Sequence, residues 1–172
     1  MIDYRIRPTV NFTKKVGELV WMLEHSRAIT INEISQLSQS DLDYLPINTS
    51  NSIGALISHI AAIEFVHQII SFENRDLNED EYKKWGSALQ LGENARAEIN
   101  NHSINFYLDE LNRVRENTIL CLKSKNDSWL YEENKWNNGV SYNNFYLWYH
   151  VMEDEISHRG QIRTIIRMLK HA

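Results

Sequence analysis

The sequence predicts an all-α protein built as a four-helix bundle, and three observations support this fold class. The 172 residues include only six glycines and two prolines, so few positions interrupt long helices. Four segments repeat apolar residues at steps of three and four, which is the period of an amphipathic helix. Two longer connections between these segments allow at least one crossover in place of simple up-and-down order. We expect a single domain over residues 1–172, because a chain of this length is too short for two well-packed cores.

Polar and proline-containing stretches delimit the first two helices. The first extends from about Phe12 to Leu37 and ends near the segment SQSDLDYLP, where Pro46 breaks the periodicity. The second follows the segment NTSNSIG, in which Ser52 is a candidate N-cap. Its apolar stripe continues to Ile70.

The second half of the chain contains a long polar connection and two more helices. Residues 72–102 are polar and too numerous for a simple link, so we expect short helical turns within them. The third helix is predicted from about Ser103 to Lys123. A loop with two tryptophans follows over residues 124–144. The fourth helix begins near Tyr142 or Asn143 and continues almost to the C-terminus.

The composition argues against several classes of partner. The balance of 18 Lys and Arg against 23 Asp and Glu gives a net charge of −5, and no basic cluster indicates a nucleic-acid partner. The single cysteine, Cys121, excludes an intramolecular disulfide and fits a reducing compartment. The chain opens without an apolar run, and no membrane-spanning segment is indicated. These features predict a cytoplasmic protein.

Polar residues interrupt the apolar stripe of the fourth helix. Between Val151 and Ile162, the stripe positions are occupied by Asp154 and His158. These two residues are four apart, so they project from one face of the helix, as do two ligands that a helix supplies to one metal ion. His150 lies one turn before Asp154, near the same face.

A third ligand has to come from a neighbouring helix, and the second helix offers His59 among apolar positions. His67, two turns further on, is another candidate that drifts from this face. Gly160 inside the fourth helix indicates a close helix approach or a site that needs room. Glu155 is a candidate acceptor that orients a histidine ring.

These residue patterns also have a simpler interpretation. An Asp and a His four residues apart commonly form an intrahelical polar pair, and a histidine beside an apolar stripe is commonly hydrogen-bonded in the core. The residues alone therefore leave open both a metal site and a satisfied polar cluster.

Two segments together resemble a known family. NSIGALISHIAAIE (51–64) and YHVMEDEISHRGQI (149–162) are similar to the two signature segments of the DinB-like superfamily, also called the YfiT-like metal-dependent hydrolases. The order and spacing of these segments fit the whole chain. The resemblance implies a four-helix bundle that is often a homodimer. It also implies a divalent metal, usually zinc or nickel, held by one histidine of the second helix and two of the last.

Carried over by position, the family's ligands fall on His59, Asp154 and His158, with an aspartate where a histidine is usual. Two histidines and one carboxylate still hold zinc, and they are also the ligand set of non-haem iron sites, so iron or manganese becomes possible. The alternative is a vestigial site without metal, in which Asp154 and His158 form a buried ion pair.

The resemblance implies a metal-dependent thiol transferase or hydrolase that acts on a small molecule, with a low-molecular-weight thiol as the candidate substrate. His59, Asp154 and His158 are then the metal ligands, and Glu155, His150 or Glu64 serves as a base or supports a ligand. The competing hypothesis is a non-catalytic dimeric bundle, a binding or stress-associated protein.

Overall fold

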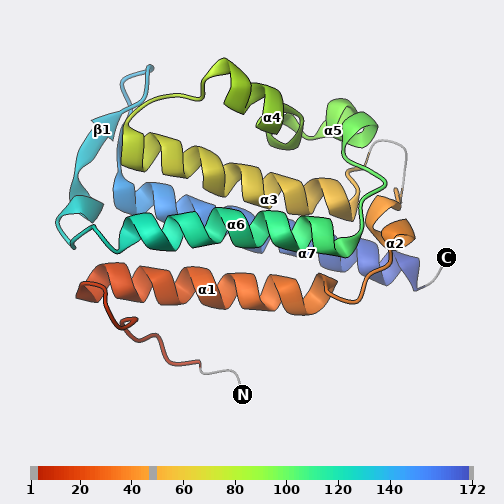
Figure 1. Cartoon of the computed structure of the whole chain (residues 1–172), viewed down its shortest axis with the longest axis horizontal. Coiled ribbons are helices and arrows are strands. Elements are labelled where there is room, and N and C mark those ends of the chain that lie inside the picture. The colour runs from red at the N-terminus through yellow and green to blue at the C-terminus, as the bar shows by residue number, and fades with distance from the viewer. Residues whose placement is uncertain (1–3, 47–49, 171–172) are drawn as a thin grey trace.

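The computed structural model describes residues 4–46 and 50–170, and four long helices lie side by side in them (Figure 1). They are α1 (Lys14–Ile34), α3 (Ile53–Gln68), α6 (Ile104–Leu122) and α7 (Asn144–Leu169). α3 packs against both α6 and α7, and α1 packs against α7 and α6. α1 and α7 run in one direction and α3 and α6 in the other (Figure 1). The predicted all-α four-helix bundle is confirmed.

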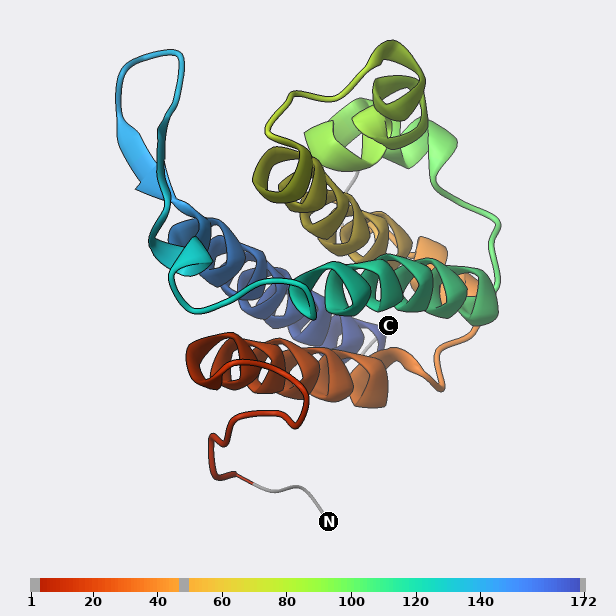
Figure 2. The same cartoon turned by 60° about the vertical axis from the view of Figure 1, so that its left-hand side comes forward.

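The predicted crossover is the connection between α3 and α6. A π-helical turn, η1 (Ile69–Glu73), extends α3, and α4 (Glu79–Gln90) and α5 (Gly92–Glu98) then lead back along the outer side of α3 to the start of α6 (Figures 1 and 2). α4 is a full helix because Asn78 and Glu81 form a capping box at its start and Trp85 and Ala88 are buried on its inner side. The short helix α2 (Gln39–Asp43) lies between α1 and α3.

The loop predicted after α6 contains two small elements at the end of the bundle. These are a 3₁₀ turn, η2 (Trp129–Tyr131), and an antiparallel pair of strands, β1 (Glu133–Lys135) and β2 (Ser141–Asn143). The strands were missed because each has three mostly exposed polar or aromatic residues, which give no alternation of apolar and polar positions. Asn143 ends the hairpin and caps α7 by accepting a hydrogen bond from the Tyr146 amide at 2.8 Å.

The most apolar helix of the bundle is also its centre. Residues Ile53–Glu73 are long and apolar enough to cross a membrane by length and composition, but 78% of the apolar window is buried inside the bundle. Burial of this extent is typical of a core helix. The apolar side chains around α3 form one cluster with α4, α6 and the end of α7, and a second cluster joins α1 to the start of α7 around Trp148.

Two glycines differ in what they allow. The expectation that Gly160 permits a close approach of another helix is wrong: the residue is exposed, and a Cβ there would meet nothing within 4 Å. The close approach occurs at Gly54 in the first turn of α3. A Cβ there would lie 2.8 Å from Cζ of the buried Tyr107 ring on α6, so α3 and α6 pack closely at this point.

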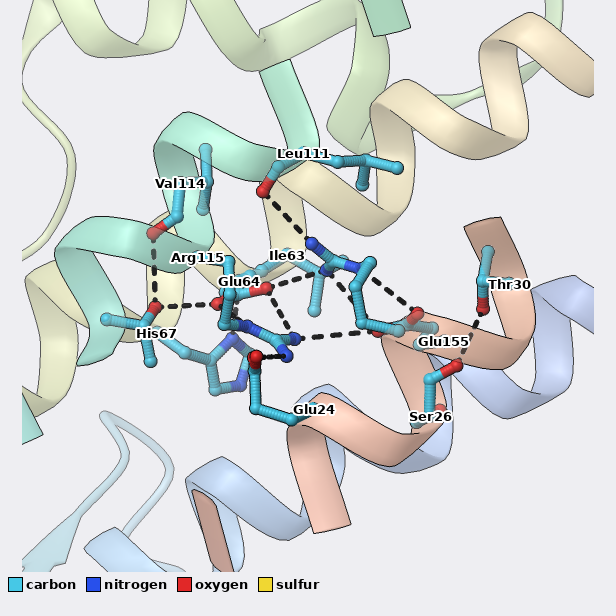
Figure 3. Close-up of polar contacts among 12 residues, drawn as sticks. Glu24, Ser26, Thr30, Ile63, Glu64, His67, Leu111, Val114, Arg115 and Glu155 are labelled. Carbon is cyan, nitrogen blue, oxygen red and sulfur yellow. Dashed lines mark hydrogen bonds and ion pairs between the residues drawn. The ribbon is translucent and has the colours of Figure 1, made fainter. Parts of the chain in front are cut away.

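Four buried charged side chains join all four long helices at the middle of the bundle. They are Arg27 of α1, Glu64 of α3, Arg115 of α6 and Glu155 of α7, and we call them the central ion-pair cluster (Figure 3). Glu64 accepts from Arg27 at 2.8 Å and from Arg115 at 2.7 and 3.0 Å. Glu155 accepts from Arg27 at 3.1 Å and lies 3.6 Å from Arg115.

A hydroxyl, a backbone carbonyl and a half-exposed carboxylate make the remaining hydrogen bonds of this cluster. The Thr118 hydroxyl donates to Glu64 at 2.6 Å, the Leu111 carbonyl accepts from Arg27 at 3.0 Å, and the half-exposed Glu24 accepts from Arg115 at 3.0 Å. Burial alone would raise the pKa of Glu64, but the two arginines outweigh it and lower the pKa to about 2. The charges therefore compensate one another inside the core.

We expect the Glu64→Gln variant to lose about 3–5 kcal/mol of unfolding free energy at pH 7, because two buried guanidinium groups would then face a single buried carboxylate. Urea denaturation followed by circular dichroism measures this loss. The matched control is Glu73→Gln, which breaks the surface ion pair with Arg75 and should cost at most about 1 kcal/mol.

The pH dependence gives a second readout of the same carboxylate. The pKa of Glu64 rises from about 2 in the folded chain to about 4.5 on unfolding, so its contribution is present above pH 4.5 and is lost as the pH falls toward 2. The stability of Glu64→Gln should decline less steeply than that of the parent over this interval. Equal slopes, or equal losses in Glu64→Gln and Glu73→Gln at pH 7, would contradict the role given to Glu64.

Candidate metal centre

The bundle brings together the three residues that the sequence singled out as ligands. His59 projects from α3, and Asp154 and His158 project from α7 toward it. Asp154 Oδ1 lies 3.5 Å from His59 Nε2 and 3.3 Å from His158 Nε2, and the two imidazole rings lie 4.6 Å apart. One ligand atom from each residue lies within 4.8 Å of the other two. Two helices that are distant in sequence thus present two nitrogens and one oxygen to a common point.

The crossover helix α4 fixes the orientation of the His59 ring. His59 Nδ1 lies 2.8 Å from the carbonyl oxygen of Ala88. Because a carbonyl only accepts, Nδ1 carries the proton and donates it, which leaves Nε2 to face Asp154 and His158. A histidine that ligates a metal through one nitrogen commonly donates the other N–H to such an acceptor, so His59 is oriented as a metal ligand would be.

The three donor atoms fit a small divalent cation. Ligand atoms placed about 2 Å from a tetrahedral zinc ion are roughly 3.3 Å apart, which is close to both distances measured from Asp154 Oδ1. Asp154 Oδ2 and His158 Nδ1 are buried without a hydrogen-bond partner in the described part of the chain. The Asp154 carboxylate therefore keeps lone pairs that no protein donor uses, and the ring of His158 lacks the support that Ala88 gives to His59.

Opposing effects set the charges of this group. Burial would raise the pKa of Asp154, but hydrogen bonds to His158 and His59 outweigh it and lower that pKa well below its ordinary value. Burial would lower the pKa of His59, but the hydrogen bonds to Asp154 and Ala88 outweigh it and raise that pKa. The aspartate is therefore ionised at neutral pH and attracts a positive charge, either a proton on His59 or a cation.

The residues predicted as a base or as support for a ligand, Glu155, His150 and Glu64, have other partners in the structure, and Glu64 belongs to the central ion-pair cluster. Glu155 is fully buried, and both of its carboxylate oxygens face the guanidinium groups of Arg27 and Arg115 in the central ion-pair cluster (Figure 3). His150 is partly exposed, and its Nδ1 lies 3.3 Å from Glu153 Oε2. The roles given to these residues remain predictions.

A buried histidine beside the site received little weight from the sequence. His67 lies two turns beyond His59 on α3, and its ring centroid is 5.4 Å from that of His150. His67 Nδ1 lies 2.7 Å from the Ile63 carbonyl, and burial lowers the pKa of His67 to about 4. The imidazole is therefore neutral at pH 7. The spacing of eight residues from His59 was the available signal, because it places His67 about two turns further along α3, although about 80° away around the helix axis.

Comparisons with known proteins show a family and agree with this fold. The model of the family described as Mycothiol-S-transferase matches residues 18–169. A crystal structure of a conserved protein from Enterococcus faecalis superposes with a TM-score of 0.68 at 15% identity, covering 90% of this chain and 96% of that one. A crystal structure of a protein from Streptococcus pneumoniae has a TM-score of 0.63 at 15% identity, covering 91% and 90%. At this identity both show the fold alone. No curated protein matches the sequence.

We expect the Asp154→Asn substitution to lower the pKa of His59 in the metal-free chain. The substitution removes the carboxylate that favours the protonated ring, while the burial that disfavours it remains. Imidazole ¹⁵N chemical shifts, recorded against pH after chelator treatment, measure this change. In the parent the ring should titrate above 6.5 and in the variant below it, with His102 as an internal reference. A His59 titration that is the same in both chains would contradict the pairing with Asp154.

Proposed function

The chain belongs to the mycothiol-S-transferase family, one of the DinB-like families, and we propose that it is a metal-dependent transferase acting on a low-molecular-weight thiol. The observation that carries this proposal is the convergence of His59 Nε2, Asp154 Oδ1 and His158 Nε2 at the spacing of metal ligands. The family match supports a thiol as the co-substrate. Hydrolysis of a small substrate at the same centre is the closest alternative chemistry.

The site residues would have different roles in such a reaction. A divalent cation held by His59, Asp154 and His158 would supply the Lewis acidity that activates a thiol near neutral pH. In the transfer, the thiol sulfur forms a bond to an electrophilic carbon of the second substrate, the bond from that carbon to its leaving group breaks, and the thiol proton is released. Burial lowers the pKa of His67 to about 4, so this neutral imidazole is a weak base and is disfavoured as the acceptor of that proton.

The carboxylate of Asp154 bears on which metal the site prefers. Zinc or nickel is expected from the resemblance to DinB-like proteins. A carboxylate is a harder ligand than imidazole and shifts the preference toward iron or manganese relative to three histidines. We propose zinc or nickel as the resident metal, with iron or manganese as the alternatives that Asp154 favours.

A second candidate function is a non-catalytic bundle with a metal-free site. The observation that favours it is that Asp154 Oδ1 lies within hydrogen-bond reach of both histidines, so the three side chains can satisfy one another without a cation. In this case the protein is a binding or stress-associated protein, and the cluster stabilises the α3–α7 contact.

The setting of the reaction is proposed on the same basis. We propose a homodimer in the cytoplasm, with no nucleic-acid and no membrane partner. The net charge of −5 argues against a nucleic-acid partner, the free cysteine fits a reducing compartment, and the homodimer rests on the resemblance to DinB-like proteins.

We expect the chain, purified without chelator, to contain close to one transition-metal ion per protein by elemental analysis. His59→Ala and His158→Ala should each reduce the metal content at least tenfold, because each removes one of three protein ligands. Asp154→His restores the usual ligand set and should bind zinc more tightly than the parent.

The matched control for this measurement is His102→Ala. The His102 ring stacks on Phe106 with centroids 3.9 Å apart and does not belong to the group of three ligand candidates, so this variant should keep the parental metal content. Background metal in the parent, together with no thermal shift on adding zinc, nickel, manganese or iron(II), would favour the metal-free alternative. Unchanged zinc affinity in Asp154→His would show that Asp154 does not occupy the ligand position.

We expect the metal-loaded protein to conjugate a thiol to a haloalkyl bimane, a fluorogenic electrophile. Mycothiol, bacillithiol, glutathione and cysteine are compared as thiols. His59→Ala should lower kcat/KM at least about a hundredfold, because it removes one of the three metal ligands. No turnover with any of these thiols in a protein that holds metal would contradict thiol transfer and leave hydrolysis to be tested with ester substrates.

A further inference from the structure

A pocket of about 330 Å³ lies between α1 and α7, on the side of α7 turned away from the candidate metal centre. Residues 152, 156 and 159 recur at steps of four and three and therefore share one side of the helix, whereas 154 and 158 point to the other. The N-terminal segment contributes Tyr4 and Ile6 to the rim. The wall is mostly apolar and is formed by Trp21, Met22, Ile29, Met152 and Ile156. A volume of this size is at the lower end for a small-ligand site.

An arginine without a charge partner lines this apolar pocket. The Arg159 side chain is buried, with 7% of the residue exposed, and in the part of the chain that the structure describes no carboxylate pairs with it. Its hydrogen bonds all come from Nη1, which donates to the Ser26 carbonyl at 2.9 Å and to the Ser26 and Thr30 hydroxyls at 3.1 and 3.4 Å. Nε is buried without a partner.

This arrangement differs from every other buried arginine of the described chain. Arg27 and Arg115 are equally buried, but each faces two carboxylates in the central ion-pair cluster. A buried guanidinium that is anchored only by neutral acceptors keeps its full charge and is stabilised by any anion that reaches it.

We propose that the α1–α7 pocket binds a small amphipathic carboxylate, whose charged end pairs with Arg159 and whose apolar body lies against Trp21, Ile29 and Ile156. A guanidinium with no carboxylate at ion-pair distance in the described chain, set beside an apolar wall, specifies both ends of this ligand. The Ser26 hydroxyl accepts from Arg159 and retains its own proton to donate to a carboxylate oxygen.

His25 gives the pocket a second polar group beside the aromatic wall. Its ring stacks on Trp21 with centroids 4.9 Å apart and meets Tyr4 edge to face at 6.1 Å. The contact with Tyr4 attaches the N-terminal segment to the rim of the pocket. A bound ligand would therefore lie under Tyr4 and Ile6, which are 79% and 58% exposed, and would cover part of their apolar surface.

The test uses the full chain, treated with chelator, and octanoate as the probe in titration calorimetry. We expect saturable binding of one octanoate per chain with a dissociation constant on the order of 0.1 mM. The neutral probe 1-octanol and the cationic probe octylammonium should bind at least about tenfold more weakly, because neither pairs with a guanidinium. Metal-free His59→Ala and His158→Ala proteins should bind octanoate like the parent.

Two variants locate the site. Arg159→Met removes the charge and keeps an apolar side chain, and it should weaken octanoate at least about tenfold. Ile156→Glu, at a half-exposed position of the wall, places a repelling carboxylate in the pocket without disturbing the core and should have the same effect. The matched control is Arg167→Met on the same helix, which removes an exposed arginine in the last turn of α7 and should leave octanoate binding unchanged.

Several results would overturn the proposal. They are the absence of saturable octanoate binding, equal binding of octanoate and 1-octanol, and parental affinity in Ile156→Glu. Loss of octanoate binding in His158→Ala would show that octanoate binds at the candidate metal centre and not in the α1–α7 pocket. A dimer that Ile156→Glu dissociates, in a protein that binds no octanoate, would assign the pocket to a second copy of the chain. If Arg159→Met fails to fold, Ile156→Glu decides alone.

Discussion

The rest of the structure depends on the central ion-pair cluster, because it sets the rotation of all four long helices about their axes. Arg27, Glu64, Arg115 and Glu155 come from four different helices and are almost fully buried. Paired buried charges tolerate little displacement, since a broken pair leaves an uncompensated charge in the core. The direction of Glu155 on α7 therefore also determines where its neighbours point. Successive residues of a helix differ by about 100°, so Glu155 turned toward α1 and α6 leaves Asp154 and His158 turned toward α3.

The same argument applies on α3. Glu64 points into the cluster, and His59 lies five residues earlier, on a side of the helix that reaches both α7 and the crossover helix α4. The Ala88 carbonyl then selects the His59 nitrogen that faces Asp154. The candidate metal centre is thus positioned by two sets of contacts. The ion pairs at the middle of the bundle determine the direction in which the ligand side chains point. The Ala88 carbonyl of the crossover fixes the orientation of the His59 ring. A connection that is usually variable in such bundles is here part of the site.

The sequence predicted those features that depend on periodicity, and it missed those that depend on long-range pairing. The four long helices, Ser52 as the cap of α3, and the convergence of His59 with Asp154 and His158 follow from apolar spacing and family resemblance. Glu155 was predicted to accept a hydrogen bond from a histidine ring. Its partners in the structure, Arg27 and Arg115, are 128 and 40 positions away in the sequence. No local pattern links them. Gly160 looked like a packing glycine for a similar reason: whether a helical glycine meets a neighbour depends on which face the tertiary fold covers, and its face is exposed.

α7 therefore carries three sets of polar side chains that face different surroundings. Glu155 pairs inside the bundle, Asp154 and His158 face α3, and Arg159 faces the α1–α7 pocket. The adjacent residues His158 and Arg159 differ by about 100° around the axis, so one dipeptide serves two separate environments. Both oxygens of Glu155, four residues before Arg159, lie against the guanidinium groups of Arg27 and Arg115. Arg159 is held instead by the Ser26 carbonyl and the Ser26 and Thr30 hydroxyls, and this leaves its guanidinium beside the apolar pocket without an ion-pair partner in the described chain.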